Sequence, residues 1–238
     1  FFKTNLIISS DGKNSSLSKK IPKSGKDYSQ TALTFLAKAE NDLGEKAFQI
    51  FSDYGICAFM PSTREKEKVV TVVWSIPNDL IKDGYDEFIE NNLEKISKKI
   101  KNNFHIKSEI QSFKLASHNK SRYVEFPIVL VGDSAHSIHP LAGQGVNLGF
   151  EDANSLVKKI TNTINQSDSI KLKEDLENYS NERRFQNELM LKTMDGFVAL
   201  FEQKNPYVRF LRNFGLNTFD HSKFLKSFFV KVASGPIR

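Results

Sequence analysis

The stretch 129–149 constrains the fold of this chain more than any other part of its sequence. A short apolar and β-branched run, 126–131, ends at Gly132 and is followed directly by Asp133. This pattern predicts a buried strand of a parallel sheet, with the acidic residue at its carboxyl end. Ligands of open α/β sheets bind at that end of the strands, where a carboxylate can accept hydrogen bonds from ligand hydroxyls.

A loop that contains Pro140, Gly143 and Gly145 leads from this strand into a helix. The two glycines let a planar ligand approach the backbone, and they permit positive φ where the chain bends. Apolar residues then recur at steps of three and four, which predicts an amphipathic helix that begins near 145–147. Its apolar residues are Val146, Phe150, Ala153, Val157, Ile160 and Ile164. The first amides of such a helix and the positive end of its dipole favour negative charge on a bound group.

Other interpretations of the same residues have to be weighed. The glycines lie a whole loop after the strand and lack the spacing of a dinucleotide fingerprint, so we reject that interpretation. Asp133, His136 and His139 are three residues apart and would form a metal site on a continuous helix, which Pro140 disfavours. Ser134 with His136 and Asp133 is a candidate nucleophilic triad, but it lacks the Gly-x-Ser-x-Gly elbow. A glycine-rich structural turn is the simplest alternative.

The stretch from Gly132 to Asp152 resembles the second FAD motif of class A flavoprotein monooxygenases, and above all that of ubiquinone-biosynthesis hydroxylases that oxidise polyprenylated phenols. The resemblance is carried by Gly132-Asp133-Ser134-Ala135-His136, Pro140, Gly143-Gln144-Gly145, Asn147 and Asp152. The middle of the chain also resembles the family, at Tyr28-x-Gln30-x-Ala32, Gln49-x-Phe51, Gly55-x-x-Ala58-x-x-Pro61 and Val73-Trp74. Near the end of the chain the similar segments include Tyr179-x-x-Glu182-Arg183-Arg184 and Arg212-x-x-Gly215-Leu216.

This resemblance implies an enzyme that uses FAD, NAD(P)H and O2 to hydroxylate a polyprenylated phenol ring in ubiquinone biosynthesis, with a biosynthetic complex as a further partner. It also implies that Asp133, held after Gly132, binds the ribityl chain of FAD and that Pro140 lines the reacting region of the flavin. The backbone at the pyrimidine edge of the isoalloxazine ring is expected from Gly143, Gln144, Gly145, Val146 and Asn147. No catalytic residue is identified and no metal is expected. Structural hydrogen bonds are the expected role of His136 and His139.

A second segment, 9–15, resembles the family's Gly-Ala-Asp-Gly-x-x-Ser motif, which lies near both the flavin and the nicotinamide nucleotide. The resemblance implies that Asp11 contributes to cofactor binding. This chain has two serines where the family has Gly-Ala, and Ser18 where the family has a basic residue, with Lys19 and Lys20 next to it. Asp-Gly is also a common dipeptide of ordinary turns, which is the alternative for this segment.

We expect an α/β (α+β) fold: an incomplete FAD-binding domain with an inserted β-sheet substrate domain and carboxyl-terminal helices. The expected boundaries are 1–26 and 119–170 for the partial FAD-binding domain, 27–118 for the substrate domain and 171–238 for the helical region. A sheet of about four strands is predicted from 31–39, 47–51, 56–60 and 69–75. Further elements are predicted at 89–100 (helix), 112–116 and 122–125 (strands), and from 172 onward (long helices, interrupted near 205–206).

The family begins with a strand, Gly-x-Gly-x-x-Gly and a helix that hold the FAD pyrophosphate. This chain has no such pattern and begins at Phe1-Phe2, just before the strand-like run 6–8. We therefore expect it to be the carboxyl-terminal portion of a longer protein. An inactive fragment or a scaffold subunit of a biosynthetic complex is one alternative, and a flavin monooxygenase that acts on another aromatic compound is a second.

The composition excludes some classes of protein and leaves others open. The 238 residues are enough for a real core, and their net charge of +6 comes from scattered lysines without a nucleic-acid-binding motif, so we expect no nucleic-acid partner. A single cysteine, Cys57, fits a reducing compartment such as the cytoplasm. No apolar stretch is long enough to cross a bilayer. The amphipathic stretch 223–232 fits either a peripheral membrane contact or packing on the parent domain.

Overall fold

The computed structural model describes residues 4–62, 68–82, 84–140, 143–164, 169–203, 205–223 and 227. The chain separates into two compact units, Phe1–Lys192 and Thr193–Arg238. Two parts of the sequence prediction lie outside the described residues: the loop positions 141–142, and most of the amphipathic stretch 223–232. The expected α/β (α+β) fold class is confirmed, since the structure combines mixed sheets with helices.

The largest sheet has six antiparallel strands in the order β4-β5-β6-β3-β7, with β8 also paired to β3. Their bounds are β3 Asp27–Ala39, β4 Phe48–Ser52, β5 Gly55–Pro61, β6 Val69–Pro77, β7 Phe104–Ile106 and β8 Gln111–Ala116. The four predicted strands are therefore present, but the expected size of the sheet was too small. The thirteen-residue β3 accommodates β7 and β8 one after the other along the same edge. β8 is mostly exposed on both faces, so it lacks the apolar alternation that would have revealed its place in the sheet.

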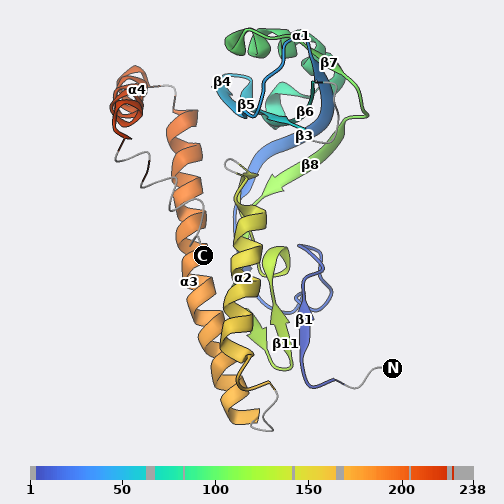
Figure 1. The fold of residues 1–238 in the computed structure, drawn as a ribbon, viewed down its shortest axis with the longest axis vertical. Helices are drawn as coiled ribbons and strands as arrows, with labels where there is room; N and C mark the ends of the chain where they lie inside the picture. Colours follow the sequence, from blue (N-terminus) through green and yellow to red (C-terminus); the bar gives the residue numbers. More distant parts are fainter. Residues whose placement is uncertain are drawn as a thin grey trace. The chain divides into compact units, whose positions relative to one another are not determined.

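Helix α1 (Tyr85–Ser97) covers one face of this sheet (Figure 1). The helix continues as a 3-10 turn, η2 (Lys98–Ile100), and another 3-10 turn, η1 (Asn78–Leu80), precedes it. Ile89 and Ile96 of α1 are buried against the sheet, where Trp74 and Phe59 are fully buried. This core explains the predicted apolar periodicity at 89–100, because each recurring position points toward the sheet.

The amino-terminal strand β1 (Ile7–Ser9) pairs in parallel with β11 (Ile128–Leu130), and β10 (Val124–Glu125) pairs antiparallel with β11 (Figure 1). The predicted strand 126–131 is shorter than expected because residues 126–127 form the turn between β10 and β11. A further small sheet contains β12 (His136–Ser137), β9 (His118–Lys120) and β2 (Lys23–Ser24).

Polar contacts join helix α2 (Gly145–Ile160) to the middle of the long helix α3 (Ser169–Glu202). Lys159 of α2 forms a 2.8 Å ion pair with Glu182 of α3. Between these helices and β11 lies a second core that contains Leu130, Leu156, Leu176, Tyr123 and Tyr179 among others.

The buried face of α2 differs from the predicted one. The buried side chains are Leu148, Asp152, Leu156 and Ile160, whereas the exposed fractions of Val146, Phe150 and Val157 are 67%, 71% and 58%. The sequence carries two apolar stripes on this helix, and periodicity alone does not decide which one faces the core. The buried carboxylate of Asp152 decides which stripe faces the core. Its hydrogen-bond partners, which include Gly132 and Arg183, lie on the core side of α2.

In the second unit, helix α4 (Pro206–His221) follows the end of α3, which agrees with the predicted interruption near 205–206. The guanidinium of Arg212 donates to the carbonyl of Phe201 at 3.3 Å and lies 4.8 Å from its ring centroid. Across the described part of the chain, no helix combines the length and apolar character that crossing a bilayer requires.

Candidate cofactor site

The carboxyl ends of two parallel strands place two acidic residues at one edge of a sheet. Ser9 ends β1 in register with Leu130 of β11, and the amide of Val131 donates to the Ser9 carbonyl at 3.0 Å. Asp11 follows β1 and Asp133 follows β11, so both leave the sheet at the same edge (Figure 1). The sequence predicted each residue separately, and the parallel pairing of β1 with β11 brings them to this common edge.

Asp133 lies in a 3-10 turn, η3 (Gly132–Ser134), that directly follows β11, and its side chain is exposed. The backbone carbonyl of Asp133 accepts a 3.1 Å hydrogen bond from Nε2 of His118, a buried residue of β9. Burial and the positive charge of Lys23 lower the pKa of His118 to about 4, so its ring is neutral at pH 7. The turn therefore fixes the main chain of Asp133 and leaves its carboxylate open to a ligand.

Asp11 is also exposed, and two serines hold its carboxylate. Ser9 stands where the family has Gly, and Ser15 is the serine that follows Asp-Gly in the motif. Ser9 Oγ donates to Asp11 Oδ1 at 2.6 Å, and Ser15 Oγ lies 2.9 Å from Ser9 Oγ. Hydrogen bonds from Ser9 and Ser15 lower the pKa of Asp11, so this residue is an acceptor at neutral pH.

The loop after β12 and the start of α2 form an open polypeptide surface. Pro140, Gly143, Val146 and Asn147 are exposed, and Gly143 has a φ of +62°. A Cβ built at Gly143 or at Gly145 would meet nothing within 4 Å. The first intrahelical bond of α2 runs from the amide of Leu148 to the carbonyl of Gln144, so the amides before it point out of the helix end.

These residues fit a flavin. An acidic acceptor for ligand hydroxyls lies at the strand end, and a helix amino terminus that is free of bulk faces solvent nearby in sequence. The carboxylate is the acceptor that the hydroxyls of a ribityl chain require, and the helix amides are the donors that an electron-rich ring edge requires. Most of the predicted flavin-contacting residues are exposed, namely Asp11, Asp133, Pro140, Gly143, Val146 and Asn147, whereas Gly132, Gln144 and Gly145 are partly buried.

The turn is supported from below by a buried polar network that the sequence analysis did not assign. Asp152 of α2 is fully buried and accepts from the amide of Gly132 at 2.9 Å and from His136 Nε2 at 2.6 Å. Its second oxygen accepts from Arg183 Nε at 2.7 Å and Asn187 Nδ2 at 3.1 Å, both on α3. Although burial alone raises the pKa of Asp152, the hydrogen bonds from His136, Arg183 and Gly132 outweigh it and lower that pKa.

Both histidines of the metal and triad alternatives make structural hydrogen bonds, as the sequence analysis expected. His136 is engaged by Asp152, and His139 is buried with Nε2 3.0 Å from Gln30 Oε1 on β3. The described residues contain no group of three or more His, Cys, Asp or Glu side chains that is arranged for a metal ion. Ser134 Oγ is buried and donates to the Ser9 carbonyl at 2.6 Å, so it joins β1 to η3 and is not presented as a nucleophile.

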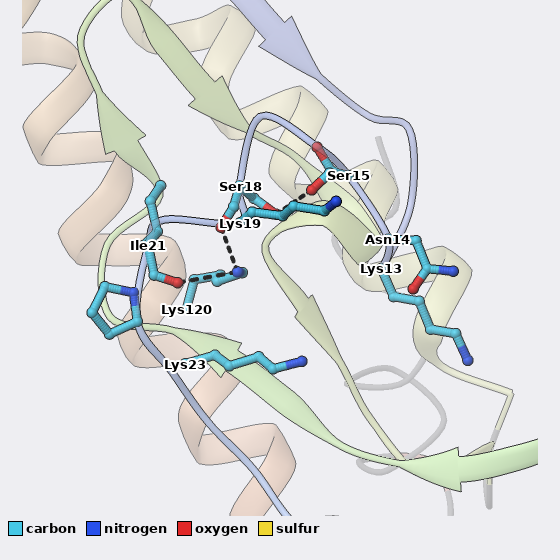
Figure 2. A pocket seen from close by; sticks show the side chains of 9 residues that line it. Lys13, Asn14, Ser15, Ser18, Lys19, Ile21, Lys23 and Lys120 are labelled. Carbon is cyan, nitrogen blue, oxygen red and sulfur yellow. Dashed lines mark hydrogen bonds between the residues drawn. The ribbon is translucent and has the colours of Figure 1, made fainter.

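A pocket of about 580 Å³ lies beside the segment that follows Asp11 (Figure 2). Its lining residues are Lys13, Asn14, Ser15, Ser18, Lys19, Ile21, Pro22, Lys23 and Lys120. Lys120 is 6% exposed, and its Nζ donates to the carbonyls of Ser18 at 2.6 Å and Ile21 at 3.1 Å. Burial and the charge of Lys23 lower its pKa. Sequence analysis did not predict this pocket, because Lys120 lies about a hundred residues from the carbonyls it contacts.

The profile of the FAD-binding domain family matches residues 2–193. The chain belongs to this family. The match covers the two strand ends, the helix amino terminus and the buried network together, so the resemblance to class A FAD-dependent monooxygenases stated from the sequence is confirmed.

Named proteins similar to this member of the FAD-binding family include ubiquinone-pathway hydroxylases. The chain is 30% identical over 234 residues to 3-demethoxyubiquinol 3-hydroxylase of Escherichia coli. This alignment covers 97% of the chain and 59% of that protein. It is 38% identical over 125 residues to the mitochondrial ubiquinone biosynthesis monooxygenase COQ6 of Schizosaccharomyces pombe, covering 52% of the chain and 26% of that protein. The chain thus spans less than two thirds of the length of these relatives.

Solved structures show the same fold in the FAD-binding family at low identity. The crystal structure of p-nitrophenol 4-monooxygenase from Pseudomonas putida aligns with a TM-score of 0.71 at 18% identity, over 93% of this chain and 56% of that one. CabE, an aromatic hydroxylase from angucycline biosynthesis, aligns with a TM-score of 0.69 at 16% identity, over 97% of this chain and 46% of that one.

Proposed function

We propose that the protein carrying this chain is an FAD-dependent monooxygenase that hydroxylates a polyprenylated phenol ring in ubiquinone biosynthesis, with O2 and NAD(P)H as co-substrates. The observation that carries the proposal is the common edge of β1 and β11, where Asp11 and Asp133 leave adjacent parallel strands within a chain of the FAD-binding family. The names of the relatives, a 3-demethoxyubiquinol hydroxylase and ubiquinone biosynthesis monooxygenases, support the choice of substrate class.

Each candidate residue has a role that its surroundings allow. Asp133, which follows Gly132, accepts hydrogen bonds from the ribityl hydroxyls, and Asp11 contributes an acceptor from the neighbouring strand. Pro140 and the backbone of Gly143 and Gln144 line the ring. The amides of Gly145, Val146 and Asn147 would hold its pyrimidine edge, and the helix dipole would favour negative charge there.

FAD, when bound, supplies the redox chemistry that no side chain can supply. The work of this chain is to bind and orient the ring, to hold charge at its edge, and to exclude water. The open position of the α2 amino terminus supports the second task, since its amides need no rearrangement to donate.

We further propose that the lysine-lined pocket receives the phosphates of the nicotinamide nucleotide. Lys13, Lys19, Lys23 and Lys120 line it without an acidic neighbour among the lining residues (Figure 2). A buried ammonium that contacts only neutral carbonyls is unfavourable unless an anion compensates it. Ser15, which lines the pocket, contacts the Ser9 hydroxyl that donates to Asp11, and this contact supports a pocket next to the proposed flavin site.

The domain division also remains a proposal: 1–26 and 119–170 for the flavin part, 27–118 for the substrate part and 171–238 for the helical part. A cytoplasmic location with a peripheral membrane contact would suit a polyprenylated substrate, which partitions into lipid. A ubiquinone-biosynthesis complex would be a natural partner for the same reason.

The flavin assignment is tested with the full gene product that contains residues 1–238. We expect the purified protein to retain FAD and to convert a polyprenylated phenol, followed by product mass analysis. Asp133→Ala should lower flavin retention and hydroxylation at least about tenfold, because a charge-assisted hydrogen bond is lost. Asp53→Ala, in the exposed β4–β5 turn, is the control and should match wild type. Full activity of Asp133→Ala would contradict the assignment.

The nucleotide assignment is tested separately by the KM for NAD(P)H. Lys23→Gln should raise this KM several-fold and weaken its dependence on salt, because one cation near the phosphates is lost. Lys114→Gln, on the exposed strand β8, removes the same charge outside the pocket and serves as the control. Equal KM values for the two variants would contradict the assignment of the nucleotide phosphates to this pocket.

A further inference from the structure

A single buried carboxylate, that of Asp152, connects the turn under the proposed flavin site to α3. Four donors converge on it: the Gly132 amide and His136 Nε2 on one oxygen, and Arg183 Nε and Asn187 Nδ2 on the other. Asp152 and Asn187 are fully buried, and Arg183 is 3% exposed. The carboxylate therefore has its acceptor capacity filled entirely by protein groups and has no access to a ligand.

The Gly132 end of this network is a backbone position with little intrinsic preference for its conformation. Gly132 has a φ of +63°, and a Cβ built on it would lie 3.7 Å from the Cα of Gly149. That distance is an ordinary contact, so crowding does not fix the turn. The hydrogen bond from the Gly132 amide to Asp152 therefore helps to select this conformation from the many that glycine can adopt, together with the 2.8 Å bond from the Ala135 amide to the Gly132 carbonyl.

Asp133 follows Gly132 directly, so the orientation of Gly132 sets the direction in which the Asp133 side chain leaves β11. The same carboxylate oxygen holds His136, two residues beyond Ser134, which is itself tied to the Ser9 carbonyl. Both ends of η3 are thus anchored, one through Asp152 and the other through β1. A ligand that binds Asp133 meets a carboxylate whose position is already set, which lowers the entropic cost of binding.

Both carboxylate oxygens of Asp152 are needed as acceptors for the network. Asparagine has the same outline as aspartate but only one acceptor oxygen. Its NH2 group would take the place of one carboxylate oxygen of Asp152 and would face the two donors that bond to that oxygen now. Arg183, which donates to Asp152, also contacts Glu151 at 3.2 Å, and Glu151 is partly exposed. Glu151 therefore offers a neighbouring carboxylate that touches the same guanidinium without touching Gly132.

We propose that Asp152 is a positioning residue for the flavin: it holds the Gly132 amide and so orients Asp133 toward the ribityl chain. This inference rests on the proposed function. It adds a residue that does not contact the cofactor and acts on it through the backbone of η3.

The test compares Asp152→Asn with the matched control Glu151→Gln in the full gene product. Flavin-free protein is titrated with FAD, and the quenching of flavin fluorescence gives the Kd. Asp152→Asn should raise the Kd about tenfold, while Glu151→Gln should stay within about twofold of wild type. Because a mainly structural role would lower thermal stability without changing the Kd of the folded protein, the Kd is the deciding quantity. A Kd for folded Asp152→Asn within about twofold of wild type overturns the proposal.

A second measurement needs no variant and no flavin. Hydrogen exchange at the Gly132 amide should be slow in flavin-free wild type, as expected for an amide already bonded to a buried acceptor. Exchange as fast as that of exposed loop amides would overturn the proposal even if Asp152→Asn does not fold. Wild type that binds no FAD but protects Gly132 would refute the proposed function and leave the Asp152–Gly132 arrangement standing.

Discussion

Nε2 of His139 lies 3.0 Å from Oε1 of Gln30, and this contact joins the loop before Pro140 to strand β3 of the large sheet. Both residues are buried, and the ring of Tyr28 meets the His139 ring edge-on with centroids 4.8 Å apart. The loop proposed to line the flavin is therefore attached directly to the sheet proposed to hold the substrate. The contact joins two residues that are 109 positions apart in the sequence.

Gln30→Ala should destabilise the protein by about 1–3 kcal/mol, because the buried imidazole loses a hydrogen-bond partner. The free energy of unfolding from urea titration measures the effect. Gln111→Ala, at an exposed position of β8, is the matched control and should change stability by less than about 0.5 kcal/mol. Equal losses in both variants would show that the His139 contact has no special weight.

Tyr179→Phe should cost about 1–2 kcal/mol of stability, since the Tyr179 hydroxyl donates to the Leu130 carbonyl at 2.8 Å in the core between α3 and β11. Burial raises the pKa of this phenol far above its ordinary value, so the hydroxyl remains a donor throughout the accessible pH range. Thermal or urea unfolding measures the loss. Tyr207→Phe, at an 81% exposed position of α4, should leave the unfolding midpoint unchanged.

Gly132→Ala should destabilise by about 1–2 kcal/mol, because alanine at a φ of +63° adopts the left-handed region at a steric cost. Gly196→Ala, inside α3, should have the opposite sign and stabilise by up to about 1 kcal/mol, since its Cβ would meet nothing within 4 Å. Denaturant midpoints of the two variants distinguish these outcomes. A neutral Gly132→Ala would mean that the turn relaxes freely.

Stability should fall on acidification partly through His118, whose pKa in the folded protein is lowered to about 4 by burial and by Lys23. The unfolded chain binds the proton below about pH 6.5, whereas the folded protein does not until near pH 4. The contribution is thus complete above pH 6.5 and is lost progressively as pH falls toward 4, on the order of 3 kcal/mol in total.

The pH profile of unfolding free energy in His118→Asn should be flatter than that of wild type between pH 6.5 and 4. His105→Asn, at an exposed position of β7, is the control and should reproduce the wild-type slope. If His118→Asn and wild type run parallel across this window, the neutral buried imidazole assigned to His118 is wrong.

The sequence alone determined the elements whose signals are local. The run that became β11, the acidic residue behind it, and the periodic helix after Gly145 were all predicted from neighbouring residues, because burial of one strand or one helix face leaves a regular pattern. The resemblance located Asp11 and Asp133 for the same reason, since each belongs to a short contiguous motif.

Only the tertiary structure decided which residues meet across the chain. The parallel pairing of β1 with β11 brings Asp11 to the edge of Asp133, and β3 receives β7 and β8, neither of which has a distinctive pattern. The face of α2 that is buried was mispredicted, because apolar residues occur on two stripes and the buried Asp152 selects one of them. Hydrogen bonds between separate elements, such as Asp152 with Arg183 and Ser134 with the Ser9 carbonyl, leave no periodic trace in the sequence, and they hold the site together.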